Sequence, residues 1–131
     1  MVKITSLRID PDRASKGVWF DWDHGVRFLI ARIGNPNFDE RLRELIEADQ
    51  AAGKSAPEAQ EAATIQAVAE TLLLGWEGLD DDNGKPLKWT AKRSHELLAD
   101  PALQDIYKFV VLKASETARF RAEADAEALG N

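Results

Sequence analysis

The chain has 131 residues, 44% of them hydrophobic and 31% charged, and no cysteine; this composition fits one folded domain over residues 1–131 and excludes disulfide scaffolds and thiolate zinc sites. The apolar runs are only a few residues long, so we expect no membrane span and no secretory signal. The absence of cysteine fits the reducing conditions of the cytoplasm, where we expect the protein to be located. The net charge of −6 divides into +2 over residues 1–35 (six basic, four acidic) and −8 over the rest (eleven basic, nineteen acidic), which disfavours duplex DNA and anionic membranes as partners and favours proteins.

The N-terminal residues 1–34 predict a β-hairpin region. Lys3–Ile9 resembles a short strand that ends at Asp10-Pro11. Val18–Trp22 and Val26–Ile30 predict two further strands, because both are rich in aromatic and β-branched residues and a three-residue loop with a final glycine separates them.

The register of this hairpin follows from its cross-strand pairs. A three-residue loop places Phe20 opposite Phe28 on one face and Trp19 opposite Leu29 on the other, whereas a two-residue loop would pair apolar with charged residues. We expect the face with Phe20 and Phe28 to pack on the core. Trp19 and Leu29 then lie on a second face that needs a cover or a partner.

Residues 37–115 predict a helical body. Asn37 with Glu40 forms a capping-box pattern before a helix whose apolar face contains Leu42 and Ile46, and Ser55 with Glu58 repeats that pattern before a second helix that we expect to stop at Gly75. Thr90 can cap a short third helix.

Asp100-Pro101 predicts the start of the last long helix, because aspartate is a good N-cap and proline fits the first turn. Residues 116–131 keep helical propensity but lose the broad apolar face, so we expect a helix that projects or frays from the body. The fold class is therefore α+β, mostly α-helical with about four helices and an N-terminal antiparallel hairpin or three-stranded sheet.

The most distinctive segment, residues 76–89, predicts a hairpin corner with a tryptophan on each side of an acidic tip. Its Asp80–Gly84 run suggests a calcium loop, but an EF-hand that places Gly84 at position six puts Leu79 at position one and Thr90 at position twelve, and neither is a carboxylate. We expect a solvated turn without a metal.

No other pattern predicts catalysis. His24 and His95 share no ligand spacing, no nucleophile motif is present and no glycine-rich phosphate loop occurs. We therefore expect no enzyme activity, no catalytic residue, no cofactor and no bound metal. An aromatic hairpin could stack single-stranded bases, but such a platform needs more basic residues than this segment carries.

Three segments in this order resemble the tail assembly chaperones of long-tailed bacteriophages: the hairpin running into "VRFLIARIGNPNFDERL", then "LLLGWEGLDDDNGKPLKWT", then "HELLADPALQDIYKFVVLKA". Together they cover most of residues 15–120. The resemblance implies a phage or prophage protein that binds the tape measure protein, helps to recruit tail tube protein, acts in the cytoplasm of the bacterial host and is absent from the mature virion.

We expect partner contacts at Trp19 and Leu29 on the second hairpin face and at Phe120 on the terminal helix. Two other functions remain open from the sequence: a structural head–tail joining or tail component of the virion, and a small nucleic-acid-binding module that uses the hairpin aromatics. A homo-oligomer formed by pairing of exposed sheet edges is also open.

Overall fold

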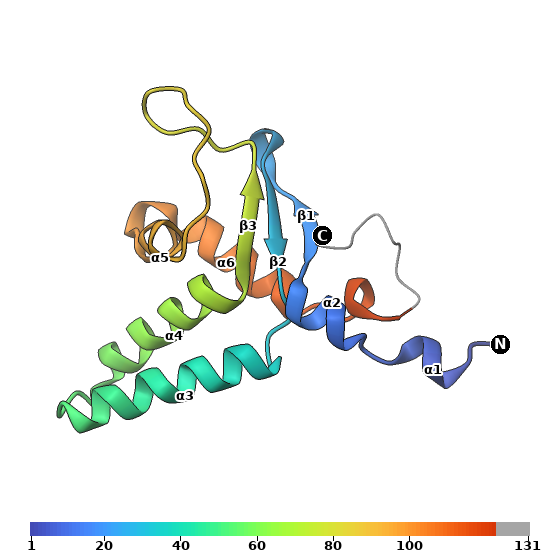
Figure 1. Ribbon diagram of the computed structural model, residues 1–131, viewed down its shortest axis with the longest axis horizontal. Coiled ribbons are helices and arrows are strands. Elements are labelled where there is room, and N and C mark those ends of the chain that lie inside the picture. Colours follow the sequence, from blue (N-terminus) through green and yellow to red (C-terminus); the bar gives the residue numbers. More distant parts are fainter. Residues whose placement is uncertain (123–131) are drawn as a thin grey trace.

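The computed structural model describes residues 1–122 and confirms a mostly helical α+β fold (Figure 1). This part of the chain contains six helices, four of them with seven or more residues, and a three-stranded antiparallel sheet of order β1-β2-β3. The elements are α1 (Ile4–Leu7), α2 (Pro11–Lys16), β1 (Val18–Asp21), β2 (Arg27–Ile30), α3 (Pro36–Ala51), α4 (Pro57–Thr71), β3 (Leu73–Glu77), α5 (Ala91–Ala99) and α6 (Gln104–Ala114), with 3-10 turns at Asp23–Gly25, Pro101–Leu103 and Ala118–Phe120.

The predicted hairpin register is confirmed. Phe20 lies opposite Phe28 and Trp19 lies opposite Leu29. The three-residue loop closes with the Trp22 amide donating to the Val26 carbonyl at 2.8 Å, and Gly25 takes the left-handed conformation (φ 74°) that the loop requires.

The third strand of the sheet is β3, and the prediction of a strand at Lys3–Ile9 is wrong. Residues 4–7 form the short helix α1, and Ile9 makes only an isolated bridge to Arg121. The helix expected to reach Gly75 ends at Thr71, after which the chain pairs with β2. A run such as Leu72–Leu74 fits a buried helix and a buried strand equally well, so the free edge of β2 decides its conformation.

Proline positions also correct the predicted helix starts. Asn35, not Asn37, caps α3: its side-chain oxygen accepts from the amides of Asn37 (3.0 Å) and Phe38 (3.2 Å), and Pro36 takes the first helical position. The predicted cap Ser55 would start α4 at residue 56, but α4 begins one residue later, at Pro57, and its N-terminus has no side-chain cap. Proline fits the first helical position because its missing N–H is not needed there.

The start of α5 agrees with the sequence, whereas the start of α6 differs and helix α2 is not predicted. Thr90 caps α5 by accepting from the Arg93 amide at 3.1 Å, and Asp100 accepts from the Ala102 amide at 2.9 Å. Asp10-Pro11 uses the same chemistry, with the Asp12 amide donating to Asp10 at 2.9 Å, to begin the unpredicted helix α2. The Asp-Pro signal therefore starts helix α2 at Asp10 but only the 3-10 turn Pro101–Leu103 at Asp100, and α6 begins three residues later than predicted, at Gln104.

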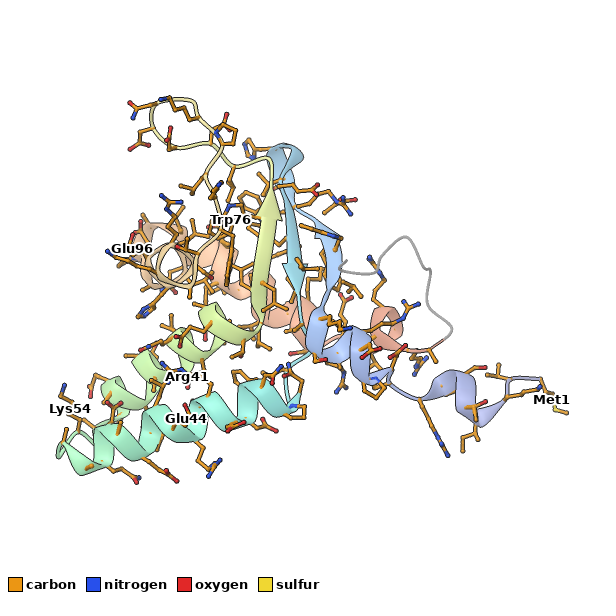
Figure 2. The ribbon with its side chains drawn as sticks, viewed as in Figure 1. Met1, Arg41, Glu44, Lys54, Trp76 and Glu96 are labelled. Atoms are coloured by element: carbon orange, nitrogen blue, oxygen red, sulfur yellow. The ribbon has the colours of Figure 1, made fainter. Side chains whose placement is uncertain are left out.

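The core lies between the sheet and the helices. Helix α6 crosses behind the sheet, and α3 and α4 run side by side as a pair that extends to one end of the molecule (Figure 1). Arg41, labelled between the two helices in Figure 2, joins this pair through an ion pair with Glu70 at 2.9 Å. The buried Ser94 hydroxyl of α5 donates to the Ala69 carbonyl of α4 at 2.7 Å. The largest fully buried apolar side chains are Phe28, Ile30, Leu72, Leu73, Leu98, Val18, Val68, Val110 and Phe120.

Residues 116–122 do not project from the body as expected. Phe120 is fully buried, its ring centroid 6.1 Å from that of Phe20. Backbone hydrogen bonds from Asp10 to Phe120 (2.8 Å) and from Ala122 to Arg8 (3.0 Å) tie this C-terminal turn to the N-terminal segment. The expected helix over the rest of residues 116–131 falls on residues 123–131, which lie outside the described part of the chain.

The corner at residues 76–89 begins from a strand rather than from a helix. Trp76 is buried at its base, where its indole N–H donates to the Leu87 carbonyl at 2.8 Å. In the loop above it (Figure 1), Asp81 accepts from the amides of Asn83 and Lys85 at 2.8 and 3.0 Å. Over residues 1–122, no helix has the length and apolar character needed to span a bilayer.

Burial of Phe120 makes the C-terminal turn part of the folded unit, and this can be tested. We expect Phe120→Ala to lower the free energy of unfolding by about 3–5 kcal/mol, because it removes a fully buried aromatic ring. The matched control is Leu112→Ala on α6, whose side chain is 62% exposed and whose loss should cost less than about 0.5 kcal/mol. Urea unfolding midpoints measure both, and equal small losses would show that the turn is not packed on the core.

Two glycines with the same backbone conformation give a second test. Gly78 (φ 86°) and Gly84 (φ 79°) are both left-handed, but a Cβ at Gly78 would lie 2.6 Å from the Gly25 carbonyl oxygen, whereas one at Gly84 meets nothing within 4 Å. We expect Gly84→Ala to cost about 1 kcal/mol from strain alone and Gly78→Ala about 3 kcal/mol or more, because strain and overlap add. Equal unfolding midpoints for the two variants would contradict the close packing of the β1–β2 loop on the end of β3.

Candidate functional site

The two faces of the sheet differ in what covers them. Phe20, Phe28 and Ile30 point into the core and are at most 3% exposed. Trp19 and Leu29 point to the opposite face, where both are half-buried and neither belongs to the core cluster. We call the residues of this second face, which are Trp19, Asp21, Arg27, Leu29, Gly75 and Glu77, the sheet surface.

Gly75 shapes the centre of the sheet surface. It pairs with Leu29 across the β2–β3 ladder. A Cβ built on Gly75 would lie 3.6 Å from Leu29 Cβ and 3.9 Å from Trp19 Cη2, which is ordinary van der Waals contact. The glycine therefore leaves the flanks of Leu29 and Trp19 open at a place where any other residue would add a side chain.

The charged side chains of the sheet surface pair with one another at one end. Arg27 lies 3.2 Å from a carboxylate oxygen of Asp21 and 3.3 Å from one of Glu77. Its guanidinium carbon also lies 5.0 Å from the centroid of the Trp19 ring, within the range of a cation–π contact. Arg27 thus covers part of the Trp19 ring and pairs with carboxylates from the strands on both sides. The apolar pair of Trp19 and Leu29 is then the main feature that this face offers to a partner.

The outer edge of β1 is partly covered by the C-terminal turn. Arg119 donates from Nη2 to the Trp19 carbonyl at 2.6 Å, and its guanidinium carbon lies 4.7 Å from the centroid of the Phe20 ring. This contact occupies a backbone acceptor that a second strand would need, so edge-to-edge pairing of copies through β1 is opposed here.

The structure separates the three predicted contact residues. Trp19 and Leu29 lie together on the sheet surface, whereas Phe120 is buried beside Phe20 and is unavailable for contact in the folded chain. The prediction of Phe120 as a surface contact is therefore wrong. Gly75 is the residue that sequence reasoning missed, because its run was assigned to a helix; the only signal was a glycine inside an otherwise apolar segment.

The residues singled out for possible chemistry remain apart. His24 is exposed in the β1–β2 loop and His95 is half-buried on α5. No group of three or more His, Asp or Glu side chains in residues 1–122 could hold a metal ion. Asp81, the centre of the acidic run, uses one carboxylate oxygen to hold the turn by accepting from two amides.

The clear pKa shifts belong to packing contacts away from the sheet surface. Hydrogen bonds to Glu70 raise the pKa of Arg41 above its ordinary value, against a smaller effect of burial. Burial raises the pKa of the Tyr107 hydroxyl, and the nearby Glu61 carboxylate raises it further. Both shifts are explained by helix–helix packing.

One hollow of about 420 Å³ lies near the start of α3, lined by residues that include Ile9, Ser15, Arg32 and Asn35. A helix N-terminus can bind anions through its free amides. Here the Asn35 side chain already accepts from the first amides of α3, so this hollow has no preformed anion site.

Comparison with known proteins agrees with the phage or prophage origin that the segment order implied. A family described as YdaY prophage protein matches residues 35–131. No curated protein and no solved structure matches the chain. Because the matched stretch is well over half of its length, the chain belongs to the YdaY prophage protein family.

Proposed function

We propose that this prophage protein is a non-catalytic tail assembly chaperone that binds the tape measure protein and assists assembly of the tail tube. Membership of a prophage family supports the general setting, and the order of the three segments described above supports the tail role. In this proposal the protein acts in the cytoplasm of the bacterial host and leaves before the virion is complete.

The observation that carries the proposal is the apolar pair on the sheet surface. Trp19 and Leu29 are half-buried but lie outside the core cluster, and Gly75 keeps the space beside them open. A long helical protein awaiting assembly must have its apolar side chains covered, because exposed apolar patches drive aggregation. A flat aromatic side chain next to an aliphatic one can cover apolar side chains of the partner without requiring one particular partner sequence.

Co-expression tests the chaperone role directly. We expect the tape measure protein encoded by the same prophage to be recovered mainly in the soluble fraction with this chain and mainly in the insoluble fraction without it. The measurement is the soluble share of tape measure protein on a gel after centrifugation. A tape measure protein that is equally soluble alone would contradict the proposed function.

Point variants test the sheet surface within the same assay. We expect Trp19→Ala combined with Leu29→Ala to reduce the soluble share severalfold, because the truncation of both apolar side chains removes the contact surface. Leu112→Ala, on an exposed position of α6, is the matched control and should behave as the wild type. Urea unfolding checks that both proteins are folded. Full solubilisation by the Trp19 and Leu29 variant would show that the partner binds elsewhere.

Composition of the purified particles separates a chaperone from a virion component. We expect mass spectrometry of induced, purified phage particles to show tape measure and tail tube proteins but not this chain. Its recovery at a fixed copy number would favour a structural head–tail joining or tail component instead. Salt-sensitive binding of single-stranded oligonucleotides would favour the nucleic-acid-binding alternative.

A further inference from the structure

The strongly exposed large hydrophobic side chains of residues 1–122 are concentrated at the N-terminus. Met1, Val2, Ile4 and Leu7 are 126%, 65%, 71% and 42% exposed, and the fifth such residue is Leu112 on α6. We call residues 1–8 the N-terminal arm. Four apolar side chains within seven positions form a patch of the kind that marks an interaction surface.

The arm extends away from the rest of the molecule. In Figure 1 it leads from α2 to the end of the molecule opposite the α3–α4 tip, and Figure 2 labels Met1 and Lys54 at these opposite ends. Its base is fixed by the Ala122 amide, which donates to the Arg8 carbonyl at 3.0 Å. The helix α1 within it has only four residues and buries none of them, so its own chain provides little to stabilise it.

Helix α3 carries a second apolar surface of complementary charge. Leu42 and Ile46, one turn apart, line an open hollow of about 400 Å³ together with Asp39, Arg43 and Glu47. We call these five residues the α3 hollow. Both leucine and isoleucine are half-buried, so apolar surface remains available between the charged side chains.

Electrostatics distinguish the arm from the α3 hollow. Residues 1–9 contain Lys3 and Arg8 and no acidic residue, whereas residues 36–71, which form the α3–α4 pair, contain eight acidic and three basic residues. Of those three, Arg41 is already held by Glu70 at 2.9 Å and Glu44 at 3.3 Å. Arg43 lines the α3 hollow beside Asp39 and Glu47, so the hollow itself carries one negative charge more than positive. A basic apolar segment therefore meets opposite charge and apolar surface together on α3.

We propose that the N-terminal arm of one copy of this chain docks on the α3 hollow of a second copy. The arm points away from its own α3, so the contact joins different molecules (Figure 1). It is heterologous, because arm and hollow are different surfaces, and two copies joined in this way keep one free arm and one free hollow. Copies therefore add head to tail into chains, or into rings if the rotation between them closes.

The strength of this contact follows from its size and charge. An eight-residue arm buries less than the roughly 1,200 Å² of a standard interface, so a single contact is weak. Its charged part is solvent-exposed and is screened by salt. We therefore expect sedimentation velocity to show association that grows with protein concentration and falls as the salt concentration rises.

Charge reversal in matched pairs tests the docking. The arm variant is Lys3→Glu with Arg8→Glu, and the hollow variant is Asp39→Lys with Glu47→Lys. Each alone should weaken self-association about tenfold, because like charges then face each other. Mixing the two variants should restore association, since every arm in the mixture finds a hollow of opposite charge. These side chains are exposed and make no ion pair within residues 1–122, so the arm variant should keep the wild-type urea midpoint. Asp39 lies in the first turn of α3, so the hollow variant should unfold at a slightly lower urea concentration while remaining folded under the conditions of the association assay.

Two further proteins complete the experiment. A chain lacking residues 2–8 should remain monomeric at concentrations where the wild type associates, and Leu112→Glu on α6 should associate as the wild type does. A wild type that stays monomeric at all concentrations, association that persists without the arm, or a mixture of reversed variants that does not associate would each overturn the proposal. None of these outcomes depends on the tape measure protein, so the tail role and the self-association can fail separately.

Discussion

Strand β2 and the three residues that follow it hold the layers of this fold together. β2 pairs with β1 along one edge and with β3 along the other. Directly after it, the amides of Ala31, Arg32 and Ile33 donate to the carbonyls of Leu72, Ala14 and Ala114 at 2.8, 2.8 and 2.9 Å. These acceptors come from the end of α4, from α2 and from the end of α6, so one seven-residue stretch fixes the sheet and three helices.

This arrangement also determines the sheet surface. Side chains alternate along β2, so Phe28 and Ile30 can face the core only if Leu29 faces the other side. A slip of one residue would bury Arg27 and Leu29 and expose Phe28, which the core does not permit. The position of Leu29 beside Trp19 and Gly75 is therefore a consequence of burying its neighbours, and the chain keeps a half-buried apolar pair there, outside the core.

The sequence was sufficient where local chemistry decides the structure. The hairpin register followed from cross-strand pairs, and the caps at Thr90 and Asp100 followed from their own side chains. Tertiary contacts decided the rest. Leu73–Glu77 is a strand because β2 offers an unpaired edge, and Phe120 is buried because the 3-10 turn returns it to Phe20. Of the candidate contacts, Trp19 and Leu29 could be placed from alternation, whereas Gly75 depended on this long-range pairing.

The family match covers only part of the surfaces that the two proposed contacts use. Residues 35–131 include α3 to α6 and β3, but β2, the strand that pairs with β3, lies before them. The part before residue 35, which the family does not match, also contains Trp19, Leu29 and the N-terminal arm. The matched region contains Gly75 and the α3 hollow. Both proposed contacts therefore combine a matched and an unmatched part of this chain. Because β3 needs β2 to pair its backbone, the N-terminal residues complete the sheet as well as contributing half of each proposed contact.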